Sequence, residues 1–214
     1  MGIIGAGKVG TTLARLALRA GWDVVMSGSP RQPMQALIVE TLVPGARLLT
    51  EADVVAAADL VIFAVPFGKA DAIDVDALSG KVVVDAMNYW YPVDGHLAAV
   101  DDFPGSTAEY TQARNPRMRL VKSLNHLGYH DMETDARPTG DPDRRAVVVA
   151  ADDPDARALV ARFVDDLGFD PVLTGLADGV HLEEGGPVFG VPLTEGQLVA
   201  ALAGHCVRTD ILAR

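Results

Sequence analysis

The sequence predicts a doubly wound, mostly parallel α/β sheet of about eight strands, followed by a C-terminal helical segment. Strand and helix signals alternate along most of the chain, as such a sheet requires. The continuous apolar run 60–65 has the composition of a central strand buried on both faces, and residues 81–85, with Val82 to Val84 at their centre, repeat the pattern. The chain also opens with an apolar strand that leads into a glycine turn and an amphipathic helix.

The first strand ends at Ile4, and the helix that follows the glycine turn ends at Gly21, a favoured C′ residue. So short a first strand leaves two readings: a native residue or two precedes Met1, or translation begins within the strand. The pattern then predicts strand 23–26, helix 32–42, strand 47–49, helix 51–58, strand 60–65 ended by Pro66, and strand 81–85.

The second half continues the alternation. We expect helix 106–114, strands 119–123 and 146–150, helix 154–167, edge strand 170–173 and a last helix from Thr194. Asp153 with Pro154 forms an N-cap signal, and Thr194 with Gln197 forms a capping-box pattern. The last helix is expected to turn Leu198, Val199, Leu202 and Cys206 inward. Residues 132–144, rich in Asp, Thr, Pro and Gly, are expected to form a mobile loop.

Length limits the domain organisation. Eight strands within 214 residues leave no room for a separate substrate domain. We therefore expect one domain over residues 1–214, in which residues 178–214 complete a substrate site built from loops at the carboxyl ends of the strands.

Composition excludes several classes of partner. A net charge of −11 argues against nucleic acid and anionic membrane surfaces. The single cysteine, Cys206, excludes an internal disulfide framework and favours the reducing cytoplasm. No apolar run is long enough for a membrane span. His126, His130 and Asp131 match no strong metal-ligand spacing, so no metal is expected.

The glycine turn has the GxGxxG spacing of a dinucleotide-binding, Rossmann-type fold. Gly5 permits the tight turn, Gly7 admits the pyrophosphate, and Gly10 allows the helix to pack close to the strand. The backbone N–H groups of Lys8 and Val9 would face the phosphates at the positive end of the helix. The alternative is a glycine turn that binds no ligand.

The end of the second strand favours NADP over NAD. NAD-binding chains usually carry Asp or Glu there, but this chain has Ser27, Gly28, Ser29, Pro30 and Arg31. Arg31 and Ser29 suit a 2′-phosphate. The alternative is a solvated turn made of residues that favour turns.

Five motifs in order resemble the NADP oxidoreductases that depend on coenzyme F-420. These are Ile4 to Gly10, Gly28-Ser29 with Arg31, Ala64-Val65-Pro66, Val84 to Asn88, and Val121 to Gly128; the segment Asp166 to Val172 extends the resemblance. The family passes a hydride between NADPH and a deazaflavin, and the resemblance implies a homodimer. It also implies binding roles: Ala6, Gly7, Lys8 and Val9 at the pyrophosphate, Ser27, Ser29 and Arg31 at the 2′-phosphate, and Ala64, Val65, Pro66 and Asn88 on the nicotinamide side.

Two departures from the family pattern concern the binding sites. Pro30 separates Ser29 from Arg31, where the family often has Ser-Arg, so the phosphate contact is expected to shift. Residues 183–190 replace a stretch that is usually leucine-rich, which leaves the second substrate open.

Hydride transfer depends mainly on stacking and exclusion of water, so no catalytic triad is expected. Lys122, Asn125 and His126 are the weak catalytic candidates, with His130 as a further proton donor for a carbonyl or imine. The alternative for each is an orienting or loop residue. Tyr89, Trp90 and Tyr91 could form a wall for a flat ring, or cover the sheet or a dimer contact.

Three functions follow from these residues. The first is hydride transfer between NADPH and coenzyme F-420 in a cytoplasmic homodimer. The second is NADPH-dependent reduction of a small imine, ketone or flavin. The third is a noncatalytic NADP sensor, which oxidation of bound NADPH by an added acceptor would exclude.

Overall fold

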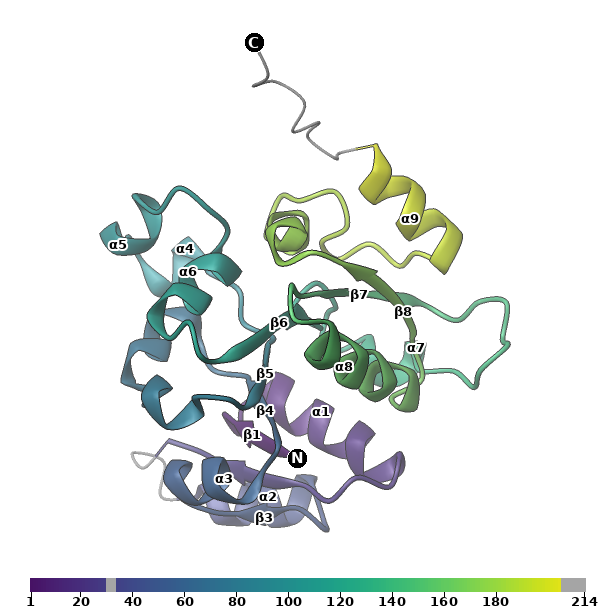
Figure 1. The fold of residues 1–214 in the computed structure, drawn as a ribbon. Coiled ribbons are helices and arrows are strands. Elements are labelled where there is room, and N and C mark those ends of the chain that lie inside the picture. Colours follow the sequence, from purple (N-terminus) through teal and green to yellow (C-terminus); the bar gives the residue numbers. More distant parts are fainter. Residues whose placement is uncertain (30–33, 205–214) are drawn as a thin grey trace.

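A computed structural model describes residues 1–29 and 34–204, and these residues form one eight-stranded sheet (Figure 1). The strand order is β3-β2-β1-β4-β5-β6-β7-β8. All neighbouring strands are parallel except β6 and β7. The strands are β1 (Gly2–Ile4), β2 (Val25–Ser27), β3 (Arg47–Leu48), β4 (Leu60–Phe63), β5 (Val82–Asp85), β6 (Arg119–Ser123), β7 (Ala146–Ala150) and β8 (Asp170–Thr174). The predicted Rossmann-type fold class is confirmed.

The longer helices lie where the sequence predicts them. They are α1 (Lys8–Arg19), α2 (Gln35–Leu42), α3 (Glu51–Ala57), α6 (Thr107–Arg114), α8 (Pro154–Asp166) and α9 (Glu195–Ala203). Asp153 caps α8 as expected, since its side chain accepts from the backbone N–H groups of Asp155 and Ala156. Gln197 accepts from the backbone N–H of Thr194, as the capping-box pattern predicts.

Six short helical segments have no counterpart in the predicted elements. They are α4 (Tyr91–Asp94), α5 (Ala98–Asp101), α7 (Met132–Asp135) and the 3-10 helices η1 (Phe67–Ala72), η2 (Val75–Leu78) and η3 (Leu176–Leu182). Each is too short to show a hydrophobic period in the sequence. η1 and η2 fill the β4–β5 connection, α4 and α5 lie between β5 and α6, and η3 follows β8.

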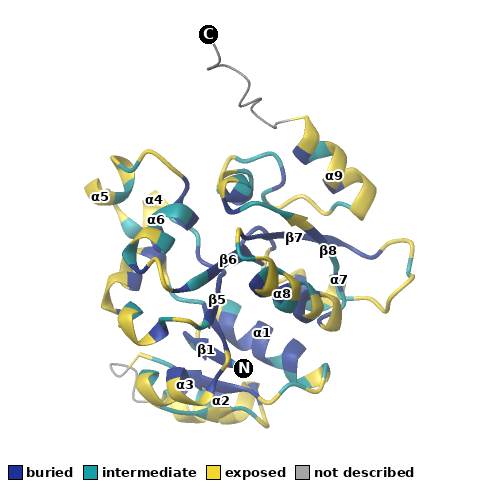
Figure 2. Cartoon of the chain, in the orientation of Figure 1, coloured by how far each residue is buried: buried dark blue, intermediate teal, exposed yellow. Residues whose placement is uncertain are grey.

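Alternate residues of the central strands point to opposite faces of the sheet. Ile3 and Ile62 pack against α1, α2 and α8, whereas Ile4 and Phe63 pack against α3, η1, η2 and α6. A third cluster joins β7 and β8 to η3 and α9. Figure 2 shows the buried strands between partly exposed helices.

Two predictions about the C-terminal half are wrong. Val199 is half-exposed, while Leu198 and Leu202 do face the core; Cys206 lies outside the described residues. Residues 132–144 are not a free loop, because α7 begins there with the buried Met132. Arg144 is also buried and pairs with Asp165 and Asp170.

Helices of the described segments are all too short or too polar to cross a lipid bilayer.

Candidate functional site

The sheet has its topological switch point between β1 and β4. From β1 the chain proceeds outward to β2 and β3, then returns to the other side of β1 as β4. Ligands of doubly wound sheets bind in the crevice at the carboxyl ends of the strands that flank such a point. Here the glycine turn follows β1, and Ala64, Val65 and Pro66 follow β4.

The glycine turn is shaped by backbone contacts. Gly5 has φ +120°, and a Cβ there would lie 2.3 Å from the carbonyl oxygen of Ala64. A Cβ on Gly10 would lie 1.9 Å from the carbonyl oxygen of Gly5. Both positions therefore require glycine because the backbone approaches too closely for any side chain.

Gly7 differs, since no atom other than those of adjacent backbone lies within 4 Å of the position its Cβ would take. It is exposed and is the N-cap residue of α1, whose first turn receives no side-chain cap within the described part of the chain. The turn thus leaves open space beside uncapped backbone donors at the positive end of a helix, which fits a phosphate group.

The predicted 2′-phosphate residues are only partly described. Ser27 ends β2 and is buried, Ser29 is exposed, and the side chain of Gln35 covers Gly28. Pro30 and Arg31 lie outside the described residues, so the Arg31 contact stays a prediction.

Lys122 and Asp85 form a buried ion pair where β5 and β6 end. The two residues are register partners, their N and O atoms are 3.3 Å apart, and neither side chain is exposed. Lys122 also donates to the carbonyl oxygen of Met87 at 2.5 Å, and Asp85 accepts from the backbone N–H of Met87 at 2.9 Å. This geometry suits an orienting role better than proton transfer to a substrate.

Asn88 and Asn125 connect the loops that follow the same two strands. Asn88 donates to the backbone oxygen of Asn125 at 2.7 Å, and the Asn125 amide donates to the Asn88 side chain at 2.9 Å. Asn125 also donates to the carbonyl oxygen of Leu182 in η3 at 2.8 Å. Leu124, with φ +66°, has the positive φ that bulky residues rarely adopt and sets this turn.

His126 is buried and neutral. Burial lowers its pKa to about 3, and the positive charges of Arg145 and Lys122 act in the same direction. Its Nε2 accepts from the backbone N–H of Val148 at 3.4 Å. A neutral imidazole with no solvent access cannot supply a proton near neutral pH, which disfavours His126 as a catalytic acid.

The three aromatic residues after β5 have different environments. The Tyr89 hydroxyl bonds Gly95, Leu97 and Asp101, so this side chain holds the loop together. Trp90 and Tyr91 are 51% and 55% exposed, and the Tyr91 ring packs against the His96 ring at 4.3 Å between ring centres.

The β6–α7 loop, residues 124–131, reaches back to the glycine turn. Lys8 donates to the Tyr129 hydroxyl at 2.9 Å, although 121 positions separate the two residues. Just beyond the loop, Glu133 pairs with Arg15 at 2.6 Å and with Arg19 at 2.8 Å. The hydrogen bond from Arg15 is the main reason that the pKa of Glu133 lies below its ordinary value. Neither contact was predicted.

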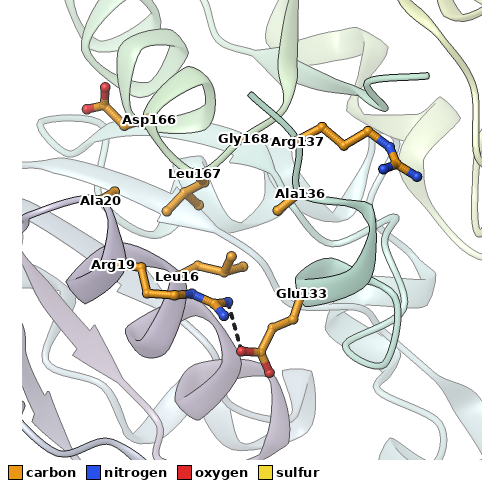
Figure 3. A pocket seen from close by; sticks show the side chains of 9 residues that line it. All are labelled: Leu16, Arg19, Ala20, Glu133, Ala136, Arg137, Asp166, Leu167 and Gly168. Atoms are coloured by element: carbon orange, nitrogen blue, oxygen red, sulfur yellow. Dashed lines mark hydrogen bonds and ion pairs between the residues drawn. The ribbon is translucent and has the colours of Figure 1, made fainter. Parts of the chain in front are cut away.

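A hollow of about 330 Å³ lies between α1, α7 and the end of α8 (Figure 3). It is lined by Leu16, Arg19, Ala20, Glu133, Ala136, Arg137, Asp166, Leu167 and Gly168. It adjoins the C-terminal end of α1, whereas the glycine turn is at the N-terminal end, roughly 18 Å away by helix geometry. We therefore do not assign this hollow to the nucleotide.

Residues 1–29 and 34–204 contain no group of three or more His, Cys, Asp or Glu side chains that could hold a metal ion.

Comparison with known proteins supports the nucleotide-binding assignment. The family model described as NADP oxidoreductase, coenzyme F-420-dependent, matches residues 1–89. A protein from Arthrobacter sp. FB24, provisionally described as an F-420-dependent NADP reductase, is 26% identical with a TM-score of 0.68, over 84% of this chain and 86% of that one. No curated protein matches the sequence.

Two other structures share the fold at lower identity. The hypothetical protein SMa0349 from Sinorhizobium meliloti has a TM-score of 0.73 at 24% identity, over 91% of this chain and 94% of that one. An imine reductase from Myxococcus stipitatus has a TM-score of 0.61 at 16% identity, over 86% of this chain and 57% of that one.

The predicted resemblance is thus confirmed over residues 1–89, which match the model of the coenzyme F-420-dependent NADP oxidoreductases, and over 84% of its length the chain shares the fold of a protein provisionally described as an F-420-dependent NADP reductase.

Proposed function

We propose that the protein transfers a hydride between NADPH and a deazaflavin, with coenzyme F-420 as the first candidate. The observation that carries the nucleotide part is the open space at Gly7 beside the uncapped first turn of α1. A pyrophosphate there would accept from the backbone N–H groups of Lys8 and Val9. NADPH, when bound, supplies the hydride.

The remaining contacts follow the order of the strands. Ser27, Ser29 and Arg31 would receive the 2′-phosphate after β2, and the backbone around Gly5, Ala6 and Gly10 would follow the dinucleotide across the end of β1. Ala64, Val65, Pro66 and Asn88 would lie on the nicotinamide side. Because Asn88 is bonded to Asn125 in both directions, its side chain is held in one orientation.

A flat second substrate is supported by the exposed rings of Trp90 and Tyr91 after β5. The described part of residues 178–214 contributes through Leu182, whose carbonyl accepts from Asn125. In this proposal the chain positions two ring systems and keeps water out, and no side chain needs to exchange a proton with the reacting carbon. The expected homodimer and cytoplasmic location belong to the same proposal.

A second candidate is NADPH-dependent reduction of a small imine or ketone. It is favoured by His130, an exposed imidazole in the β6–α7 loop, because such a reaction needs a proton donor as well as a hydride. The fold shared with an imine reductase is compatible with this candidate.

The test is the anaerobic loss of visible absorbance of oxidised coenzyme F-420 on mixing with the protein and NADPH, repeated with NADH. Rapid bleaching with NADPH would establish the activity and the preference together. Bound NADPH that reduces an imine or ketone but not the deazaflavin would move the assignment to the second candidate. Tight binding of NADPH without reduction of any acceptor would favour the noncatalytic NADP sensor.

Arg31→Ala tests the cofactor preference. Loss of a charged contact to the 2′-phosphate should weaken NADPH by about 2 kcal/mol and leave NADH nearly unchanged. Dissociation constants from nucleotide fluorescence measure both, so NADH serves as the internal control. Equal losses for the two nucleotides would remove Arg31 from the phosphate site.

A further inference from the structure

Lys8 and Tyr129 meet at the glycine turn, where the first turn of α1 begins. The Lys8 ammonium donates to the Tyr129 hydroxyl at 2.9 Å and lies 5.1 Å from the centre of the ring. The ring of the neighbouring His130 also packs against the phenol, at 3.9 Å between ring centres. The sequence placed Lys8 at the pyrophosphate only through its backbone N–H, and gave Tyr129 no role.

The contact belongs to a larger attachment of the loop to α1. Arg15 and Arg19 follow Lys8 by seven and eleven positions, which places the three residues along one side of the helix. Arg15 and Arg19 hold Glu133, the second residue of α7, while Lys8 holds Tyr129 near the end of the β6–α7 loop. The segment from Tyr129 to Glu133 is therefore attached to α1 at both of its ends.

The Tyr129 hydroxyl and the Lys8 ammonium each have N–H or O–H groups that this contact does not use. The Tyr129 oxygen accepts from Lys8, so its own hydrogen is available to another acceptor, and the ammonium uses one of three N–H groups in this bond. Within residues 1–29 and 34–204, neither group has a further hydrogen-bond partner. Lys8 is the first residue of α1, so its side chain and the Tyr129 hydroxyl offer donors at the same end of the helix as the uncapped backbone N–H groups. An anion with several oxygens suits such a set of donors.

We propose that Lys8 and Tyr129 bind the pyrophosphate of the dinucleotide together with the first turn of α1, so that the β6–α7 loop lies as a strap across the bound nucleotide. This inference rests on the proposed binding of NADPH. It assigns Tyr129 to nucleotide binding and makes release of the nucleotide depend on separation of this loop from the phosphates.

The test compares two ligands across matched variants. Tyr129→Phe keeps the ring and removes the hydroxyl, and Lys8→Met removes the ammonium while keeping most of the stem. Each should raise the dissociation constant of NADPH about tenfold, and each should speed NADPH release in a stopped-flow displacement experiment. Binding of 2′-AMP, which has the adenosine and the 2′-phosphate but no pyrophosphate, should stay within about twofold.

Arg162→Met is the control, because it removes an equal positive charge at an exposed position of α8 and leaves the contacts between α1 and the β6–α7 loop intact. It should leave NADPH binding unchanged. Unchanged NADPH affinity in Tyr129→Phe, or a parallel loss of 2′-AMP binding, would overturn the inference while the proposed function stands. Failure of the unaltered protein to bind NADPH would overturn both.

Discussion

The ends of β1 and β5 lie in the same sheet but are built on opposite principles. After β1, the turn is made of glycine backbone, is open at Gly7 and leaves donors uncapped. After β5 and β6, side chains form the structure: Asp85 with Lys122, and Asn88 with Asn125, mostly out of contact with water. The first region is suited to receive a ligand, whereas the second fixes the loops that would surround it.

The largest expected effect is in the second region. Lys122→Met would leave the Asp85 carboxylate buried without its partner, which should lower the free energy of unfolding by about 3–5 kcal/mol. Urea unfolding measures this loss. The double variant Lys122→Met with Asp85→Leu should recover most of it, since both charges are then absent. A loss below about 1 kcal/mol in the single variant would contradict the importance of the pair.

The glycine turn offers a matched pair of substitutions with opposite consequences. Gly10→Ala should destabilise the protein by about 1–3 kcal/mol, because the new Cβ meets the Gly5 carbonyl and the helix must shift. Gly7→Ala should cost stability by no more than about 1 kcal/mol but weaken NADPH by about 1–2 kcal/mol, because its Cβ occupies the open space. Thermal unfolding and nucleotide titration separate the two effects. If the two variants lost the same amount of stability and the same amount of NADPH affinity, the assignment of Gly10 to packing and Gly7 to nucleotide binding would be wrong.

The last prediction concerns pH. His126 has a folded pKa of about 3 and an ordinary unfolded value near 6.5, so the unfolded chain binds the extra proton between these values. Its contribution to stability is therefore complete above about pH 6.5 and is lost as the pH falls, by up to about 1.4 kcal/mol per pH unit.

His126→Gln keeps an acceptor for the Val148 N–H and removes the titration. Between about pH 6.5 and about pH 5, the protein with His126 should lose about 2 kcal/mol more stability than the variant. Urea unfolding at the two pH values provides the comparison. Identical losses would show that His126 is solvated in the folded protein.

Sequence reasoning succeeded where a contact is local. The glycine turn, the Asp153 cap and the central apolar strands each depend on residues within a few positions of one another. The Lys8 contact with Tyr129 could not be predicted in this way, because it depends on the path of a loop that returns across the sheet. The signal available was the polar side of α1, where Lys8, Arg15 and Arg19 recur at helical spacing.

The Asp85 and Lys122 pair lies between these cases. Asp85 follows the apolar run Val82 to Val84, and Lys122 follows Leu120 and Val121, so charges of opposite sign come directly after two apolar runs. That pattern indicates a partner for each buried charge, but the identity of the partner required the strand order and register. The contact of Arg31 with the 2′-phosphate stays a prediction, because Arg31 lies outside the described residues.

The reversal of strand direction at β7 has a consequence for how such a short chain can surround a site. If the strand after β6 were parallel to it, the connection would have to return from the carboxyl end of β6 to the amino ends of the strands, usually as a helix. Because β7 runs antiparallel to β6, residues 124–145 are released from that crossing. One inverted strand thus leaves 22 residues at the end of the sheet where the glycine turn lies, and from there Tyr129 contacts Lys8.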